Sequence, residues 1–338
     1  MPTSAAALGS IRTALFGFVL VEVLGTGFVD LGRLPITLMR PTGLLQILSW
    51  RFYDVVLTPR GMLALKIAMV VSLAAATAGY LTSASTKSAA LLFLFYQGLV
   101  RSFGHFNHDE MPVVYMLIAL AFTPCGDAWS IDSLLHRTRT RVGDVVYGFP
   151  ILLLRGLLAW SYFSSAVIKL RVTGLGYFSS ENLPTVAILH SLDNLHDTQH
   201  RLAFWLPSAV ELTAALALLI VLWELAFPLA IFSKLARRII LPFGIIFHVA
   251  TIFFMNISFP YHLAAYAVFI DWPRLVCQLE RIPYFSQLGS RLKSSSRLAD
   301  RTQSVPKLHY ERPAEDHLRT LGDHLKRIEK GHAFTPHF

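Results

Sequence analysis

The sequence predicts an all-α polytopic membrane protein, a bundle of about eight transmembrane helices. Hydrophobic residues make up 54% of the 338 residues and charged residues only 15%, and the mean hydropathy is +0.51. A soluble domain of this size is less apolar. The apolar residues also gather in separate stretches of about 20 residues, which is the length of a helix that spans a bilayer.

Eight apolar stretches are expected to cross the membrane. The first lies near the N-terminus, but it is long, Glu22 interrupts it and no small-residue cleavage site follows it. A spanning helix is therefore favoured over a cleaved signal peptide. The fourth stretch is short for a full crossing unless protein shields its polar ends. In chain order the expected spans are residues 11–31, 61–82, 89–102, 111–122, 147–170, 208–232, 239–255 and 259–277.

The chain is expected to divide into a transmembrane domain, residues 1–280, and a basic polar tail, residues 281–338. In the domain, residues 83–87 are expected to form a turn, and residues 171–207 form the longest polar insert, of a kind that is functional or disordered. In the tail, apolar residues fall at helical spacing among basic ones: Leu318, Leu321, Leu325 and Ile328. This pattern fits a short amphipathic helix on the membrane surface and equally a marginal solvated helix.

The formal net charge of +9 indicates where the chain ends lie. Basic residues gather on one side of the expected bundle: Arg12, Lys87, the 137–141 group, the 234–238 group and the tail. By the positive-inside rule, both termini are expected in the cytoplasm. The membrane that holds the protein is expected to be the inner (plasma) membrane of a bacterium. The expected partners are the lipid bilayer and a protein docked on the tail. Nucleic acid is not expected, because no basic stripe is interleaved with aromatic residues.

The cysteines indicate no site. Cys125 and Cys277 both lie in apolar segments. Two such residues suggest neither a disulfide framework nor a cysteine-type zinc site.

A single lysine, Lys169, ends the expected span 147–170. Such a lysine either extends its ammonium group to the interface or, if it is desolvated, becomes a usable base near neutral pH. The second reading needs a neighbour that holds protons, and His108 or Glu224 could serve. Glu224 lies within an apolar stretch, where a carboxylate costs roughly 2.5–3.5 kcal/mol. We therefore expect Glu224 to be paired or protonated inside the bundle.

The densest polar cluster lies just before the expected span 111–122. It contains His105, Asn107, His108, Asp109 and Glu110 within six positions. Ionisable residues at the mouth of a membrane helix are costly and usually mark a site. This cluster and Lys169 are the two main candidates for chemistry.

Histidine spacing raises a metal-dependent alternative. His105 and His108 are three residues apart, and His196 and His200 are four apart; both spacings suit metal ligands. Membrane desaturases and hydroxylases hold two irons with histidine boxes, but the boxes here are incomplete. No metal ligand is therefore assigned. A bond from a buried histidine to a backbone carbonyl is the simplest explanation of His248.

Four motifs follow one another in the chain. They are Asn107-His108 with an apolar helix and then WSID at 129–132, YFSSAVIKL at 162–170, WELAFP at 223–228, and FHVATIFFMNISFPYHLAAYAVFIDWPR at 247–274. In order and spacing they resemble the HTTM family, the membrane domain shared with vitamin K-dependent gamma-carboxylase. The resemblance covers roughly residues 10–280.

The resemblance implies roles for particular residues. Lys169 lies where the family's lysine deprotonates a hydroquinone, and His108 lies where a histidine supports that chemistry. The implied cofactor is a quinone or hydroquinone, although the residues alone indicate none. The expected substrate pocket is formed by Asn107, Glu224, His248, Tyr261 and Trp129.

The sequence also departs from the carboxylases. Only one lysine stands in VIKL, and the following segment reads RVTGLGY without the family's acidic-tryptophan step. No counterpart of the large soluble C-terminal domain is expected. Carboxylation of a protein glutamate is therefore not expected. A lysine-base enzyme that acts on a lipophilic substrate such as a quinol is favoured. The alternatives are a non-catalytic transporter or scaffold and the histidine-box oxidase.

Overall fold

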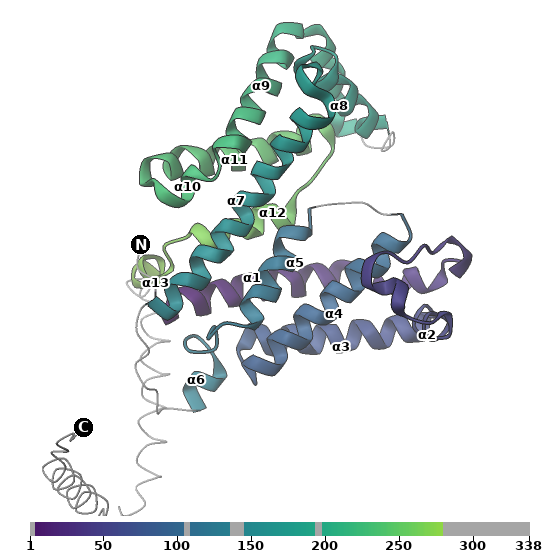
Figure 1. Ribbon diagram of the computed structural model, residues 1–338, viewed down its shortest axis with the longest axis vertical. Coiled ribbons are helices and arrows are strands. Elements are labelled where there is room, and N and C mark those ends of the chain that lie inside the picture. Colours follow the sequence, from purple (N-terminus) through teal and green to yellow (C-terminus); the bar gives the residue numbers. More distant parts are fainter. Residues whose placement is uncertain (1–3, 105–108, 136–144, 193–197, 280–338) are drawn as a thin grey trace, which may run out of the picture. The chain divides into compact units, whose positions relative to one another are not determined.

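The described part of the chain folds into helices. The computed structural model describes residues 4–104, 109–135, 145–192 and 198–279, and no strand occurs among them (Figure 1). The α-helices are α1 (Ala5–Gly25), α2 (Trp50–Val56), α3 (Pro59–Ala78), α4 (Thr82–Ser102), α5 (Met111–Ala121), α6 (Ile131–Leu135), α7 (Val145–Thr173), α8 (Asn182–Leu192), α9 (Val210–Ala226), α10 (Leu229–Phe232), α11 (Lys234–Met255), α12 (Pro260–Ala265) and α13 (Trp272–Leu279). The 3₁₀ helices are η1 (Phe28–Arg33), η2 (Ile36–Leu38), η3 (Gly43–Ile47), η4 (Gly174–Phe178), η5 (Thr198–Ser208) and η6 (Tyr266–Phe269).

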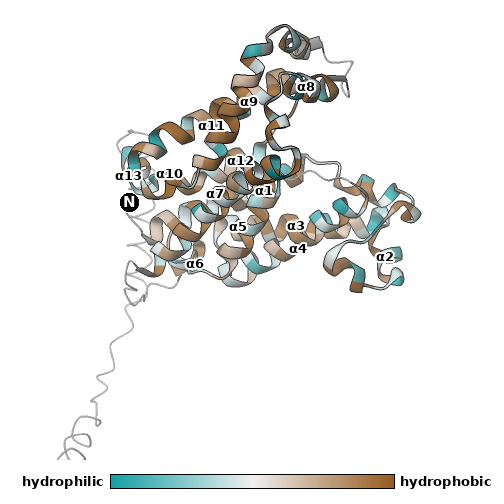
Figure 2. Ribbon diagram, turned by 45° about the horizontal axis from the view of Figure 1, so that its top comes forward, coloured by the Kyte–Doolittle hydropathy of each residue, from teal (hydrophilic) through white to brown (hydrophobic). Residues whose placement is uncertain are grey.

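Four of the described helical segments are long and apolar enough to cross a membrane. They are α1, α3, the α7–η4 segment Val146–Phe178, and α11. Hydrophobic residues predominate along them, as the colours of the ribbon show (Figure 2). The protein is thus helical and compatible with integration in a membrane. Contacts among the described residues up to 277 define one compact unit. The expected tail helix at 318–328 lies outside the described residues.

Capping groups place two helices differently from the expected spans. The hydroxyl of Ser4 accepts the N–H of Ala7, so α1 begins at Ala5, earlier than expected, and it ends at Gly25 rather than continuing to residue 31. The carboxylate of Asp132 accepts the N–H groups of Leu81 (2.9 Å) and Thr82 (2.7 Å) and the Thr82 hydroxyl (2.7 Å). This cap begins α4 at Thr82. The expected turn at 83–87 is therefore wrong, because those residues form the first turns of α4.

Two of the expected spans are interrupted. The stretch 208–232 divides at Phe227-Pro228 into α9 and α10, because a proline has no N–H to continue the helix. The stretch 259–277 divides into α12, η6 and α13, with a break at residues 270–271. The insert 171–207, expected to be a polar loop, contains η4, α8 and most of η5, and α8 packs against η5 and α11.

A buried arginine joins three segments at one end of the bundle. Arg12 was expected among the flanking charges, but it is fully buried. Its guanidinium donates to the carbonyl oxygens of Cys125 (3.2 Å), Thr77 (3.4 Å) and Trp129. Burial also raises the pKa of the Cys125 thiol, so this thiol stays neutral. Residues 129–132, one of the family-like motifs, thus have a structural role here.

Candidate functional site

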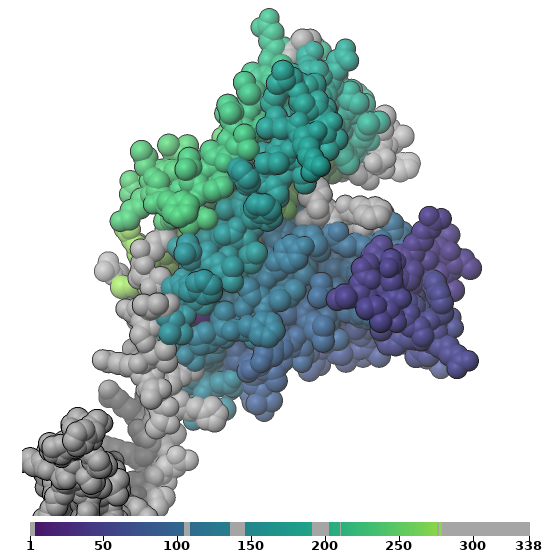
Figure 3. Space-filling model, in the orientation of Figure 1, coloured from purple at the N-terminus to yellow at the C-terminus, as the bar shows by residue number. Residues whose placement is uncertain are grey.

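A cavity of about 690 Å³ lies among α5, α7, α8, α9, α11 and α12. Most of its lining is aliphatic or aromatic, and it includes a few polar side chains. The surface is hollowed between the segment of α7 and α8 and that of α4 and α5 (Figure 3). A cavity of this size with few polar groups is typical of a small-molecule site.

An ion pair lies in the cavity wall. Lys169 Nζ is 2.6 Å from Glu224 Oε1, and the Ser165 hydroxyl donates to the same oxygen over 3.2 Å. Ser165 and Lys169 are one turn apart on α7, so they share the face that meets α9. The Lys169 side chain is 24% exposed and the Glu224 side chain 4%. Lys169 Nζ also lies 5.6 Å from the centroid of the Tyr177 ring. The lysine therefore turns into the protein and does not simply extend to the interface.

The carboxylate of Glu224 is only half satisfied. Its Oε1 has two donors, whereas Oε2 is buried and has no hydrogen-bond partner among the described residues. A buried carboxylate oxygen without a donor is costly. The missing donor favours the protonated carboxyl group, whereas the adjacent Lys169 ammonium group favours the carboxylate. The pair can therefore exist as ammonium and carboxylate or as amine and carboxylic acid.

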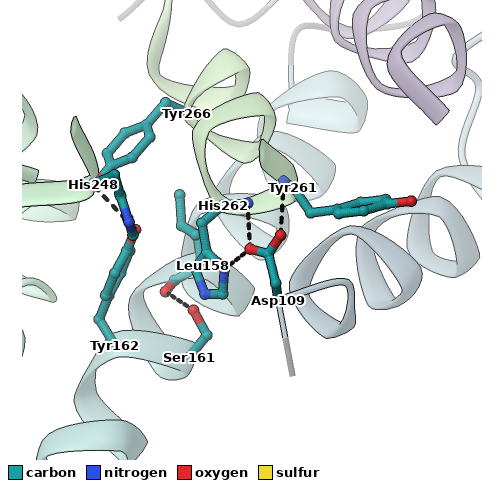
Figure 4. Close-up of polar contacts among 8 residues, drawn as sticks. All are labelled: Asp109, Leu158, Ser161, Tyr162, His248, Tyr261, His262 and Tyr266. Atoms are coloured by element: carbon teal, nitrogen blue, oxygen red, sulfur yellow. Dashed lines mark hydrogen bonds and ion pairs between the residues drawn. The ribbon is translucent and has the colours of Figure 1, made fainter. Parts of the chain in front are cut away.

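A second set of hydrogen-bonded polar side chains lies along the same wall of the cavity. The Tyr266 hydroxyl donates to the Tyr162 hydroxyl over 3.1 Å, and the Tyr162 oxygen lies 2.6 Å from His248 Nε2 (Figure 4). If Tyr162 donates to Nε2, the ring proton of His248 is on Nδ1, a tautomer inferred from the bonding. Nδ1 is buried without a partner among the described residues. The expected bond from His248 to a backbone carbonyl is therefore wrong: its ring bonds a tyrosine.

An aspartate–histidine pair completes the polar groups. His262 Nδ1 lies 2.6 Å from Asp109 Oδ1, and the carboxylate also accepts the N–H groups of Tyr261 and His262, each over 3.2 Å (Figure 4). Asp109 thus caps the start of α12 and orients the ring of His262, which lines the cavity. The His248 and His262 ring centroids are 5.7 Å apart.

The sequence patterns did not assign this aspartate–histidine pair. Asp109 was noticeable only as part of the polar cluster before α5. Pro260 was a sequence signal that could have indicated an acceptor such as Asp109 near the start of α12. A proline at the start of a helix is followed by N–H groups that need an acceptor.

The structure brings together three of the seven expected site residues. Lys169, Glu224 and His248 all line the cavity. The ring of Tyr261 instead packs against Phe18 and Phe93.

Two expected site residues lie outside the described part of the chain, and one lies elsewhere in the fold. Trp129 is 52% exposed, and its carbonyl accepts a bond from Arg12 at the junction described above. Asn107 and His108 lie outside the residues that the structure describes, as do His105 and His196. The described residues contain no group of three metal-binding side chains.

Replacing Tyr162 by phenylalanine is expected to lower the free energy of unfolding by about 1–3 kcal/mol. The change removes the hydroxyl that bonds His248 Nε2, so the buried imidazole loses the one partner it has among the described residues. Denaturant titration of the detergent-solubilised protein measures the loss. Tyr80→Phe is the control, because Tyr80 is 49% exposed. An equal effect of both changes would contradict the proposed bond.

Comparison with known proteins identifies no relative. No protein-family model matches the chain, and no curated protein and no solved structure is significantly similar to it.

Proposed function

We propose that the protein is an HTTM-type integral membrane enzyme that uses Lys169 as a base on a lipophilic substrate such as a quinol. One observation carries the proposal: the pair of Lys169 and Glu224 stands in the wall of a largely apolar cavity of about 690 Å³. Apolar walls suit a flat lipophilic molecule, and a desolvated amine–carboxyl pair can accept a proton. The resemblance of the four motifs to the HTTM family supports the same reading.

The proposed step needs one particular form of the pair. With the shared proton on Glu224, Lys169 is a neutral amine, and its nitrogen takes the phenolic proton of the substrate. The phenolic O–H bond breaks and an N–H bond forms. A neutral quinol and a neutral pair become a phenolate and a pair with one positive charge. The new ammonium group then stabilises the phenolate in a site of low dielectric constant.

The other polar groups have supporting roles in this proposal. His262, oriented by Asp109, is a second place for a proton beside the substrate, in the way that a carboxylate orients a catalytic imidazole. His108 is retained as the partner that the family resemblance implies.

The proposed setting is a bacterial inner membrane with both termini in the cytoplasm and about eight spans, some of them interrupted. Lys87, near the start of α4, and Lys234 and Arg238, at the start of α11, are exposed. The bias of lysine and arginine toward one side of the expected bundle supports this orientation.

Replacing Lys169 by arginine is expected to abolish the chemistry and to leave the fold intact, because arginine stays charged and cannot accept the proton. The measurement is oxygen uptake by an added naphthohydroquinone, whose anion reacts with oxygen faster than the neutral molecule. Wild-type protein in nanodiscs is expected to accelerate the uptake, and K169R is not.

The matched control is Lys87→Arg, since Lys87 is an exposed lysine outside the cavity. Wild-type activity in K169R would refute the role of Lys169 as base. Acceleration that is absent from wild-type protein as well would refute a quinol as substrate, and lipids extracted from the purified protein would then be identified.

A further inference from the structure

A segment that contains η1, η2, η3 and α2 joins two helices that are apolar enough to span a membrane, α1 and α3. The Thr13 hydroxyl donates to the Thr77 carbonyl over 3.4 Å, and Lys66 Nζ donates to the Thr26 carbonyl over 2.9 Å. The two helices therefore run in opposite directions. Since a spanning helix ends at the surface of the bilayer, the linking segment, residues 26–58, lies at the membrane boundary.

The linking segment is fixed to the end of the bundle and lies beside α3 and α4 (Figure 1). The N–H of Arg40 donates to the Ser102 carbonyl, at the end of α4, over 2.7 Å. Tyr53 is buried, and its hydroxyl donates to the Leu45 carbonyl. The Leu45 side chain lies so close to α4 that a Cβ on Gly98 would come within 2.9 Å of it. The segment therefore holds a defined position on α4.

Large apolar side chains of the linking segment are nevertheless exposed. Leu44 and Ile47 are each 79% exposed. Leu38, Trp50 and Val55 are exposed as well. An apolar surface of this kind marks a contact with a membrane or with another protein. Because the segment joins the ends of two helices apolar enough to span, lipid is the apolar surrounding that already adjoins it.

The charged residues of the linking segment suit the same boundary. Arg33, Arg40 and Arg51 are exposed, as are the aspartates Asp30 and Asp54. Arginine therefore outnumbers the acidic residues, and one of the three, Arg33, pairs with Asp30 over 3.0 Å. An arginine keeps its alkyl stem in apolar surroundings and its charge at the level of the phosphates, and tryptophan is enriched at the same level.

We propose that the linking segment inserts into the phospholipid leaflet at this end of the bundle. Leu44, Ile47 and Trp50 then lie in the boundary between headgroups and acyl chains, and the arginines contact the phosphates. Because the segment is fixed to α4, its insertion sets the depth at which α1, α3 and α4 stand in the bilayer. Lys87 lies at the other end of α4, so in the orientation proposed above this leaflet is the non-cytoplasmic one.

The test is spin-label spectroscopy of the full chain in vesicles of phosphatidylcholine and phosphatidylglycerol. Cys277→Ser removes the exposed native thiol, whereas Cys125 is buried, and a nitroxide is then attached at Leu44→Cys or at Ile47→Cys. Both labels are expected to collide more with oxygen, which concentrates in lipid, than with a water-soluble nickel chelate, at a depth of about 5–10 Å. The matched control is Gln46→Cys, a polar and exposed neighbour, whose label is expected to lie nearer the water.

Two results would overturn the proposal. If the labels at 44 and 47 collide with the nickel chelate as often as the label at 46, the segment faces water. If both are shielded from oxygen and from the chelate, the segment packs against protein, and cross-linking would then show whether a second copy of this chain covers it. Two exposed positions keep the test decisive if one variant does not fold. None of the three positions lines the cavity, so the outcome is independent of the chemistry proposed for Lys169.

Discussion

Replacement of Lys169 by methionine is expected to lower the free energy of unfolding by about 3–5 kcal/mol. Glu224 is 4% exposed on its side chain, and Lys169 is its only charged partner within hydrogen-bond distance among the described residues. Without the lysine, the Ser165 hydroxyl remains as the one donor to this carboxyl group. The variant must either keep an uncompensated charge in the protein or bind a proton. Denaturant titration in mixed micelles at neutral pH measures the cost.

The double variant separates loss of the pair from loss of packing. Replacing both Lys169 and Glu224, by methionine and leucine, leaves no buried charge. Its stability is expected to lie close to that of the wild type or above it, because apolar side chains often replace a buried ion pair without loss. Lys87→Met is the matched control and is expected to change stability by less than about 0.5 kcal/mol. The comparison also needs Glu224→Leu alone. If the stability losses of Lys169→Met and Glu224→Leu add up to that of the double variant, solvent screens the pair and the amine is not desolvated.

Helix positions were predictable from the sequence where the signals are local. The expected start of α5 at Met111 agrees with the structure, and α3 begins two residues before its expected start. There Thr58 supplies the cap and Pro59 the first helical residue. The start of α4 was not predictable in this way, because its cap comes from Asp132, 50 residues later in the chain than Thr82. Pro228 explains the interruption after α9 and is present in the sequence. The apolar residues on both sides of this proline nevertheless made the stretch 208–232 look like one continuous span.

In the candidate site, the sequence allowed a prediction only for the residues whose burial costs free energy. A carboxylate in an apolar stretch demands a partner, so pairing or protonation of Glu224 followed from energetics. The link between Asp109 and His262 joins residues 153 positions apart, and no periodicity connects them. The same applies to Tyr162 and His248. Trp129 and Tyr261 were expected in the pocket because of the motifs around them, but membership of a motif does not say which side chains meet a cavity.

Replacing Gly79 by alanine is expected to lower the free energy of unfolding by about 2–5 kcal/mol, for two reasons that can be measured separately. Gly79 ends α3 with a φ of 69°, in the left-handed region, where a Cβ costs roughly 1–2 kcal/mol. A Cβ here would also lie 2.3 Å from the Ser130 Cβ and 2.4 Å from the Arg12 Nη1. Overpacking of this kind typically costs about 1–3 kcal/mol.

Two further glycines separate the backbone effect from the steric one. Gly43 has a φ of 56° with no atom within 4 Å of the position that a Cβ would take, and Gly156 has neither a positive φ nor a neighbour at that distance. Gly43→Ala is therefore expected to show the backbone cost alone, and Gly156→Ala is expected to be neutral or to stabilise α7 by up to about 1 kcal/mol. If Gly79→Ala costs no more than Gly43→Ala, the close approach of Arg12 and Ser130 to α3 is not a tight contact. If it costs more, the steric overlap of the added Cβ with Ser130 and the Arg12 guanidinium accounts for the difference.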